Sequence, residues 1–528
     1  MVDGGQLREG KEPQSAGSSE ESDAGMVPEK PAKTRVTPVE SVEGRAAAEG
    51  KSAHGNAHRA QDRERAPTQV ERIGQRAKGR VGERFDNLLS ALKVPLLTEA
   101  YQRLRRSAAP GVDGVTWEEY GEHLDARLLD LQDRIHRGSY HPQPVRRVHI
   151  PKGDGRTRPL GIPTLEDKIV QQAVRRVLEP IYERMFLGFS YGFRPGRSQH
   201  DALNALAEAL SRKLNWVLDA DIRSFFDTID HGWMQRFIEH RIADRRMVRL
   251  LMKLLHAGVM EDGELREVEE GTPQGGNVSP LLANIYLHYA LDLWAQSWRK
   301  THARGEMYIV RYADDFVMGF QYEQDARAMR EALASRLAEF GLELHPDKTR
   351  VLRFGRFARE KCEREGHRRP ETFDFLGFTH IAGTDRRGAF QLKRRTSRKK
   401  RKAKLAKLSE EMRRRRHEPV QLQHAWLSSV LRGHYRYYGV PTNRSALSSF
   451  RERVRQGWHR QLQRRSQRAR WNCERCAAHE KRFPLPLPQI HHPWPSLRRA
   501  APSTRGGSPV REIRSPGSVR GAARADRR

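Results

Sequence analysis

The sequence predicts an α+β body followed by a basic helical module, and three features of its 528 residues indicate this. Between about residues 85 and 390, segments with the two-residue alternation of strands and segments with helical spacing alternate irregularly, which favours α+β over a doubly wound sheet. Residues 391–528 carry 37 basic and 8 acidic side chains, whereas residues 81–390 carry 47 and 45. Residues 1–80 are rich in Gly, Ser, Glu, Ala and Arg, poor in aromatics, and predicted to be disordered.

The composition narrows the partners and the compartment. A net charge of +32, from 98 basic and 66 acidic side chains, indicates a polyanionic partner, most simply a nucleic acid. No run of about 18 apolar residues is present, so a membrane-spanning helix is not expected. The N-terminus lacks the apolar core of a secretory signal, and three cysteines are too few for a disulfide framework. The sequence therefore predicts a cytoplasmic protein that does not contact a membrane.

The body begins with a helical segment, a hairpin and a second helix. Residues 85–106 place apolar residues at helical intervals, and a turn rich in Pro and Gly follows them. Residues 144–163 predict a hairpin, because a β-rich run, a Lys-Gly-Asp-Gly turn and a return run follow one another. Thr164 is the expected N-cap of the next helix, and Pro180 is expected to end or kink it.

Five further segments continue the mixture of strand and helix patterns. Residues 215–229 predict a strand that leads into a helix, and residues 272–295 predict a glycine turn followed by a helix. Residues 307–320 contain two short β runs that meet at two adjacent aspartates. Residues 323–340 predict a helix and residues 371–383 a hairpin.

The basic module is predicted to be helical over residues 394–416, 420–440 and 445–466. A solvated charged face and a nuclear-type signal are alternatives for its first, most basic run. Apolar and aromatic residues such as Trp426 continue through the helices, which favours a folded unit with a basic face. From about residue 483 the chain becomes Pro-rich and then rich in Arg, Gly and Ser, and is predicted to be extended or disordered.

Two pairs of acidic residues stand inside apolar β runs, where an unpaired buried acid is costly. Asp219 and Asp221 alternate with apolar neighbours and therefore share one face of their strand. Asp314 and Asp315 lie between two apolar runs, where a hairpin would present them at its tip. Carboxylates of this kind hold the two divalent ions that nucleotidyl transfer uses. An ordinary solvated turn is the alternative for Asp314 and Asp315 taken alone.

Five motifs in order resemble reverse transcriptases, and the version resembled most is the bacterial group II intron-encoded reverse transcriptase/maturase of the endonuclease-lacking type. The resemblance covers roughly residues 81–497. Its motifs are DIRSFFDTIDH at Asp221–His231, TPQGGNVSPLLANIYLH at Thr272–His288, YADD at Tyr312–Asp315, GLELHPDKTRVLRFG at Gly341–Gly355 and FDFLGFTH at Phe373–His380.

The resemblance implies a right-hand polymerase with a basic thumb. It places fingers with an N-terminal extension motif at 81–215 and a palm with the catalytic aspartates at 216–390. A helical thumb, or maturase X domain, is expected at 391–482. Disordered tails are expected at 1–80 and at 483–528, the latter Pro-rich and then basic.

The resemblance also assigns the catalytic and metal-binding residues. Asp221, Asp314 and Asp315 would bind two Mg²⁺ ions, with the backbone carbonyl of Ile222 as a further ligand. Lys348 matches the lysine that protonates the leaving pyrophosphate, with a solvated surface lysine as the alternative. Asp219 would be an acid behind the ligands or a helix cap.

A second set of residues would bind the incoming dNTP. Phe226 matches the ring that lies under the nucleotide sugar and excludes a 2′-hydroxyl, although core packing is an alternative for it. Gln274 and the turn at Gly275 would approach the nucleotide closely. Lys152 and Arg158 flank the hairpin turn that would close on the triphosphate.

The thumb would bind the template–primer duplex and the intron RNA through many basic side chains. Some of the candidate aromatic contacts there could instead be core residues. The RNA-binding candidates are Arg394, Arg395, Arg398, Lys399, Lys400, Arg401, Arg432, His434 and Arg436.

Zinc is not expected, although Cys473, Cys476 and His479 are spaced as metal ligands can be, with His491 and His492 nearby. Family members with a C-terminal endonuclease carry two CxxC pairs, and only one such pair occurs here. The resemblance therefore implies a protein that does not cut the second DNA strand itself.

The expected function is that of an RNA-directed DNA polymerase that also helps its group II intron RNA to splice and move. Its expected partners are the intron RNA, an RNA template with a DNA primer, and target DNA. A splicing-only RNA-binding maturase and a related bacterial reverse transcriptase for defence or diversification are the alternatives. The sequence leaves open the intron, the DNA target, the retention of splicing assistance, the oligomeric state and the start residue, for which Met26 is a second candidate.

Overall fold

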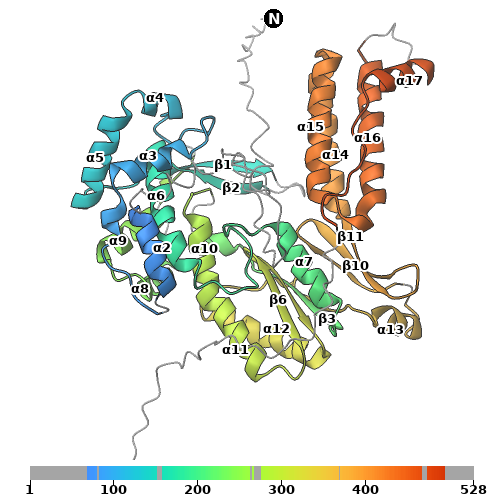
Figure 1. The fold of residues 1–528 in the computed structure, drawn as a ribbon, viewed down its shortest axis with the longest axis horizontal. Helices are drawn as coiled ribbons and strands as arrows, with labels where there is room; N and C mark the ends of the chain where they lie inside the picture. The colour runs from blue at the N-terminus through green and yellow to red at the C-terminus, as the bar shows by residue number, and fades with distance from the viewer. Residues whose placement is uncertain are drawn as a thin grey trace, which may run out of the picture.

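The computed structural model describes residues 68–79, 82–151, 157–261, 264–266, 271, 275–367, 369–465 and 473–493. Within these residues three sheets and the helices around them form an N-terminal helical region, a central sheet and a C-terminal helical unit (Figure 1). None of the helices in this described part combines the length and the hydropathy that a membrane crossing requires.

The N-terminal region packs helices around the long central helix α6 (Leu165–Tyr182). Thr164 caps α6 as predicted, because its Oγ1 accepts a hydrogen bond from the Asp167 N–H. The helix continues past Pro180 to Tyr182, so Pro180 does not end it. The other helices of this region are α2 (Gln69–Gly79), α3 (Val94–Gln102), α4 (Trp117–Gly121), α5 (Leu124–Arg137), α8 (His231–Glu239) and α9 (Arg245–Leu255).

The prediction of disorder over residues 1–80 is wrong for the segment that forms α2. Gly74 of α2 lies against Pro180 of α6, where a Cβ atom on the glycine would be 3.5 Å from the proline Cβ. Arg76 of α2 forms ion pairs with Glu83 and Asp86. Contacts with α6 and with these acids order a helix whose own composition gave little sign of it. Residues 1–67, including Met26, lie outside the described residues.

A four-stranded sheet in the order β2-β1-β4-β5 projects from this region. The predicted hairpin is confirmed as β1 (Val145–Pro151) and β2 (Thr157–Ile162), which pair antiparallel. In Figure 1 the hairpin lies between the N-terminal helices and the C-terminal helical unit. The remaining strands are β4 (Val259–Glu261) and β5 (Glu264–Arg266).

The central sheet is antiparallel, in the order β6-β7-β3-β8. Helices pack on both faces, and the predicted helix–strand alternation over residues 215–340 is confirmed. The strands are β3 (Trp216–Asp221), β6 (Met307–Tyr312), β7 (Asp315–Phe320) and β8 (Arg350–Arg353). The helices are α7 (Gln199–Leu210), α10 (Ser279–Leu287), α11 (Leu293–Thr301) and α12 (Glu323–Ala338), with a π-helical turn at His288–Asp292 between α10 and α11.

A smaller sheet in the order β11-β10-β9 joins the central sheet to the C-terminal unit. The predicted hairpin at residues 371–383 is confirmed as β9 and β10. The sheet shares a core with α7 and with the other face of the central sheet. Its elements are β9 (Thr372–Phe375), β10 (Phe378–Thr384) and β11 (Phe390–Thr396), preceded by α13 (Ala358–Arg364).

The C-terminal unit is helical as predicted and has its own core, which includes Leu431, Phe450 and Trp458. Its helices are α14 (Arg398–Arg414), α15 (Val420–Tyr438), α16 (Arg444–Gln463) and α17 (Cys473–Arg482). Residues 484–493, predicted to be extended or disordered, form an ordered segment without helix or strand. Leu485 is buried against the helices, and the Pro486 carbonyl accepts a hydrogen bond from the Tyr435 hydroxyl at 3.1 Å. Residues 494–528 lie outside the described part.

Candidate active site

The predicted acidic residues meet at one edge of the central sheet. Asp221 ends β3 and lies directly opposite Asp315, the first residue of β7. Asp315 also pairs with Tyr312 at the end of β6, so Ala313 and Asp314 form the turn between β6 and β7. The strand register thus brings together acids that are more than 90 positions apart in the sequence.

The carboxylates at this edge repel one another. Burial raises the pKa of Asp315 well above its usual value, and the charges of Asp314, Asp219 and Asp221 raise it further. Burial also raises the pKa of Asp314, with a further contribution from Asp221. Burial raises the pKa of Asp219 to about 6, against the opposing effect of Arg350. Acids in this arrangement are more stable when cations lie between them. The carboxylate oxygens of these residues are donors of the kind that Mg²⁺ prefers, although no three Asp, Glu, His or Cys residues of the described part are grouped as a metal site.

A buried arginine holds the β6–β7 turn from behind. Arg311 and Asp292 are both fully buried and form a two-point ion pair, with Nε–Oδ1 and Nη2–Oδ2 distances of 2.7 and 2.5 Å. The Nη1 atom of Arg311 also donates to the Ala313 carbonyl and to Asn284 Oδ1, each at 2.9 Å. Ala313 has a φ of +57°, which is strained for a residue with a Cβ atom. The arginine therefore fixes the backbone of the turn that carries Asp314.

Local backbone features place Asp292 and Asn284, the two side chains that accept hydrogen bonds from Arg311. Asp292 lies in the π-helical turn, an irregularity that is frequent at functional sites. Gly192 packs so closely on the turn that a Cβ atom there would be 2.2 Å from the Ala313 nitrogen. The Gly192 carbonyl accepts a hydrogen bond from Asn284 Nδ2 at 2.7 Å. The sequence analysis did not identify Arg311 or Asp292, although a single arginine within an otherwise apolar strand was a usable signal.

Ile222 follows Asp221 and pairs with Leu344 in an isolated bridge. The backbone hydrogen bonds of that bridge are made by the flanking pairs, from Arg223 N to Glu343 O and from His345 N to Asp221 O, each at 2.8 Å. The central pair of such a bridge exchanges no backbone hydrogen bond. The Ile222 carbonyl thus points away from Leu344 and is not used in this bridge.

Lys348 lies at the same edge, with its Nζ atom in an ion pair with the Asp221 carboxylate. Its side chain is about half exposed, at 53%. The ammonium group contacts a candidate metal ligand, and its exposure leaves the solvated surface lysine as the alternative.

The candidate nucleotide-binding residues are described only in part. Phe226 is half-buried and packs edge-on against Phe225, with ring centroids 5.3 Å apart, so its ring has a packing role. Gly275 lies against β2, where a Cβ atom would be 2.5 Å from the Gly161 carbonyl, and its φ of +119° requires glycine. Lys152 and Gln274 lie outside the described residues, as does the side chain of Arg158.

A basic pocket of about 270 Å³ opens at the base of the C-terminal unit. Arg395, Arg398 and Arg401 line it, together with hydroxyl groups from Thr379 and Ser445. No acidic side chain is among the described residues that line the pocket. Arg395, Arg398, Lys399 and Lys400 are exposed and Arg401 is half-buried, and Arg432 and Arg436 on α15 are exposed.

Two of the predicted RNA-contact residues are wrong, because their side chains are inside the protein. Arg394 has no exposed surface, and its guanidinium group donates to Asn204 Oδ1 at 3.3 Å. His434 is 9% exposed and its ring stacks on Phe450 with centroids 3.9 Å apart. Side chains alternate between the two faces of β11 and repeat about every 3.6 residues around α15. These two side chains therefore point inward while their neighbours face solvent.

The burial of His434 predicts an acid-sensitive fold. Burial, with a smaller effect of Lys404, lowers its pKa to about 3, whereas the unfolded chain titrates near 6.5. Below pH 6.5 the unfolded state therefore takes up a proton that the folded state does not, and this residue lowers the free energy of unfolding by about 2 kcal/mol between pH 7 and pH 5. His434→Phe should remove that loss, measured by urea denaturation at both pH values. An equal loss at pH 5 in the variant and the original protein would contradict this assignment.

The candidate zinc ligands are only partly described. Cys476 and His479 lie on α17, and the side chain of Cys473 is outside the described residues. His492 stacks on His200, with centroids 3.4 Å apart, and its Nε2 atom lies 2.6 Å from the Arg436 carbonyl. That histidine is thus used in joining the C-terminal segment to α7 and α15.

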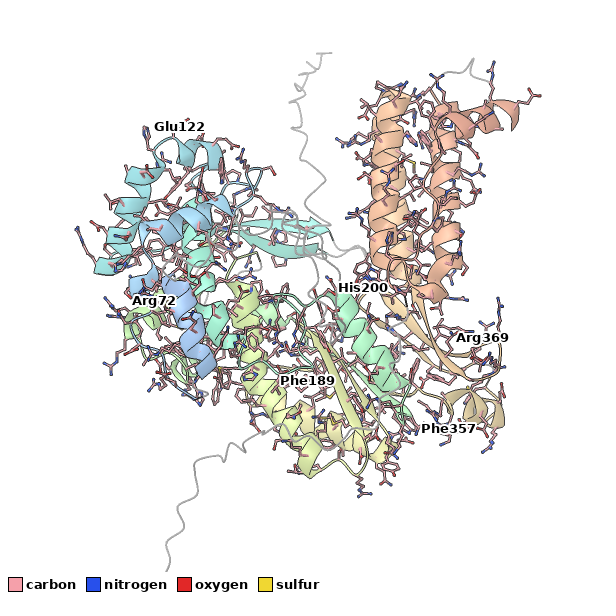
Figure 2. The ribbon with its side chains drawn as sticks, viewed as in Figure 1. Arg72, Glu122, Phe189, His200, Phe357 and Arg369 are labelled. Atoms are coloured by element: carbon pink, nitrogen blue, oxygen red, sulfur yellow. The ribbon has the colours of Figure 1, made fainter. Side chains whose placement is uncertain are left out.

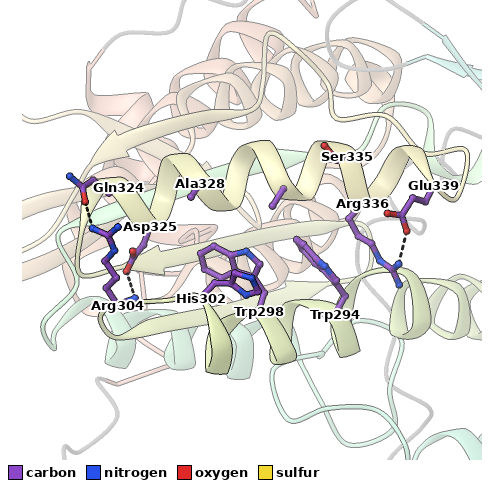
Figure 3. Close-up of a pocket in the computed structure, with 11 residues that line it drawn as sticks. Trp294, Trp298, His302, Arg304, Gln324, Asp325, Ala328, Ser335, Arg336 and Glu339 are labelled. Carbon is purple, nitrogen blue, oxygen red and sulfur yellow. Dashed lines mark hydrogen bonds and ion pairs between the residues drawn. The ribbon is translucent and has the colours of Figure 1, made fainter. Parts of the chain in front are cut away.

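A separate groove of about 870 Å³ lies between α11 and α12. Trp294 and Trp298 project from α11 toward α12 across it (Figure 3). Its lining includes none of the acidic residues of the sheet edge.

Comparison with known proteins assigns the class. Residues 150–380 match the family model described as reverse transcriptase (RNA-dependent DNA polymerase). The chain is 38% identical over 275 residues to protein YkfC of Escherichia coli. This match covers 46% of this chain and 72% of YkfC. It is 39% identical over 221 residues to the group II intron-encoded protein LtrA of Lactococcus lactis. This match covers 42% of this chain but only 37% of LtrA.

A more distant relative is the nuclear intron maturase 3 of Arabidopsis thaliana, which is 27% identical over 166 residues. This match covers 30% of this chain and 23% of that protein. The sheet with its acidic edge and the matched family model define a reverse transcriptase, an RNA-directed DNA polymerase. More narrowly, the chain belongs to the family of group II intron-encoded reverse transcriptases and maturases.

Proposed function

We propose that this protein extends a DNA primer with dNTPs on an RNA template by two-metal catalysis, and that it binds a group II intron RNA to assist its splicing and mobility. The observation that carries the proposal is the pairing of Asp221 with Asp315 beside Asp314 in the turn. In these terms residues 81–215 are the fingers, residues 216–390 the palm and residues 391–482 the thumb, with target DNA as a further partner.

Asp221, Asp314 and Asp315 would hold two Mg²⁺ ions, with the Ile222 carbonyl as a further ligand. Bound Mg²⁺ supplies Lewis-acid stabilisation of the phosphoryl group under attack and of the leaving oxygen. The Arg311 side chain fixes the turn, so the carboxylates need little rearrangement when they bind cations. Lys348 places its Nζ atom beside Asp221 and is the proposed proton donor to the leaving pyrophosphate.

The incoming nucleotide would lie between this edge and the β1–β2 hairpin. Gly275 packs on β2 and so places its turn beside the hairpin, where Gln274 is the proposed contact to the nucleotide. Lys152 and Arg158 would contact the triphosphate, since guanidinium and ammonium groups suit phosphate oxygens. Phe226 would lie under the sugar and exclude a 2′-hydroxyl. Its packing on Phe225 supports that role, because a ring held in place excludes an atom more strictly than a mobile one.

Primer extension tests the enzymatic part of the proposal. The purified protein should incorporate dNTPs on a primed RNA template in Mg²⁺, lose incorporation on addition of EDTA, and recover it with excess Mg²⁺. RNA binding without incorporation under any of these conditions would leave the splicing-only function. The relatives named as an intron-encoded protein and an intron maturase favour the maturase over a defence or diversification enzyme.

The basic pocket is the proposed contact for an RNA backbone. Replacing Arg395, Arg398 and Arg401 together by Gln should weaken binding of intron RNA and lower the slope of log K against log salt concentration by about 2–3, since each lost phosphate contact lowers it by about 1. Filter binding between low and moderate salt measures both quantities.

A matched control removes the same charge elsewhere. Arg103, Arg327 and Arg359 are exposed and paired with acids on the same helix surface, outside the thumb. Replacing these three by Gln should leave the salt slope close to its original value. Equal effects of the two triple variants would assign the pocket no specific part in RNA binding.

A further inference from the structure

The turn between β9 and β10 connects the thumb to the acidic edge of the palm. The Tyr437 hydroxyl on α15 donates a hydrogen bond to the Leu376 carbonyl in this turn, at 2.8 Å. On the other side, Leu376 packs against the apolar cluster that includes Val317 of β7, the strand that begins at Asp315, and its backbone N–H acts on the Asp315 carboxylate. One residue therefore lies between a thumb side chain and a proposed metal ligand.

Leu376 is held in a backbone conformation that it would not adopt alone. Its φ is +48°, a left-handed value that is unfavourable for a residue with a Cβ atom. The conformation turns the N–H toward Asp315 and the carbonyl toward Tyr437. Since both groups are used, the contacts on either side offset the cost of the turn, and loss of one contact should loosen the other.

The thumb side of this connection is rigid. The Tyr437 ring stacks on Phe378 of β10 and meets the His200 ring of α7 edge-on, with centroid distances of 5.8 and 5.4 Å. Figure 2 shows His200 at the base of the thumb, where α7 approaches the helical unit. Burial raises the pKa of Tyr437 well above its usual value, so the hydroxyl keeps its proton for the Leu376 carbonyl.

Other contacts tie the turn to the start of the thumb. The Ser397 N–H, one residue before α14, donates to the Gly377 carbonyl at 2.9 Å. The Ser397 hydroxyl donates to Asp374 Oδ2 at 2.8 Å. Gly377 itself faces Tyr438, whose hydroxyl would lie 2.9 Å from an added Cβ atom. A shift of α14 or α15 must therefore move the turn that contacts Asp315.

We propose that Tyr437 is a positioning residue that couples the thumb to the metal-binding edge of the palm through Leu376 and Asp315. A thumb seated on its nucleic acid would hold the turn in the conformation that presents Asp315, and a displaced thumb would release it. The inference rests on the proposed role of Asp315 as a metal ligand.

Tyr437→Phe tests the coupling, because it removes the hydroxyl and keeps the packed ring. We expect kcat for primer extension to fall about 3- to 10-fold, the effect of one hydrogen bond, with the KM for primer–template unchanged. Mg²⁺ binding, titrated calorimetrically without nucleotide, should weaken by a similar factor. These changes differ from those of a lost packing contact, which would lower the melting temperature first.

Tyr435→Phe is the matched control. Tyr435 lies on the same helix and its hydroxyl also donates to a backbone carbonyl, that of Pro486 in the C-terminal segment. It should change neither kcat nor Mg²⁺ affinity. If Tyr437→Phe behaved like Tyr435→Phe, or lowered the melting temperature more than Tyr435→Phe while Mg²⁺ affinity stayed the same, the coupling would be wrong.

Failure of the proposed function would look different. In that case Asp314→Ala would retain DNA synthesis, whatever the result at Tyr437. Loss of synthesis in Asp314→Ala together with an unaffected Tyr437→Phe overturns the coupling alone.

Discussion

Asp314→Ala is expected to lower the rate of DNA synthesis on an RNA template by about 10³-fold or more, since a metal ion contributes several kcal/mol of transition-state stabilisation. Asp314 is the residue of the turn nearest its tip and lies beside the Asp221–Asp315 pair. Its loss removes a proposed ligand and also relieves the repulsion that raises the pKa of Asp315. Asp314→Asn should be as inactive, because the neutral amide keeps the shape but not the charge.

Intron RNA affinity should stay within about twofold in Asp314→Ala, because each phosphate contact proposed for the thumb remains. Asp133→Ala serves as the control, since Asp133 is an exposed acid on α5 that pairs with Arg137. It should change neither synthesis nor binding. A parallel loss of RNA affinity and synthesis in Asp314→Ala would contradict the division of tasks between palm and thumb.

Asp292→Ala is expected to lower the free energy of unfolding by about 3–5 kcal/mol, because it leaves a buried charge without its partner. Arg311 has no exposed surface, and Asp292 supplies both of its carboxylate contacts. The arginine would then draw water into the core or leave its place, and in either case the Ala313 carbonyl loses its donor. DNA synthesis should fall with stability. Urea denaturation and primer extension measure the two effects.

The double variant Asp292→Leu with Arg311→Met separates the two roles of this ion pair. Replacing both charges by apolar side chains of similar volume is often neutral for stability. The double variant should therefore regain most of the stability and little of the activity, because no donor holds the turn. Removing the exposed pair on α12 through Glu323→Ala should cost less than about 1 kcal/mol. Full activity in the double variant would show that the turn needs no such support.

Local sequence patterns were sufficient to predict the elements that form the proposed active site. The β1–β2 hairpin, the β9–β10 hairpin and the Thr164 cap each depend on residues within a few positions, and each is confirmed. The same is true of the paired β runs around Asp314 and Asp315, where the change from apolar to acidic residues marks the turn. The roles of these aspartates stay predictions until the variants are measured.

The wrong predictions concern segments in which the residue types suggested exposure or disorder but the packing of the folded chain buries the side chains. Arg394 and His434 belong to the most basic part of the chain, and residue type suggested exposed contacts for both. Asn204 of α7 contacts Arg394, and Phe450 of α16 stacks on His434. Packing against these two helices decides which face of β11 and of α15 is buried. Helix α2 was missed for a related reason, because its few apolar residues, such as Ala77, are buried against a core that other helices, including α6, supply.

The sequence by itself determined the acidic strand end, the acidic turn and the separation of a neutral body from a basic module, because alternation, turn residues and charge are read over short windows. Only the tertiary structure decided what lies behind the acids. Arg311 and Asp292 are charges that can be buried solely because a π-helical turn brings them together. The contact of Tyr437 with Leu376 likewise exists only once the thumb stands on the small sheet. Such pairs depend on desolvation and distance in the folded chain, which no spacing along the sequence records.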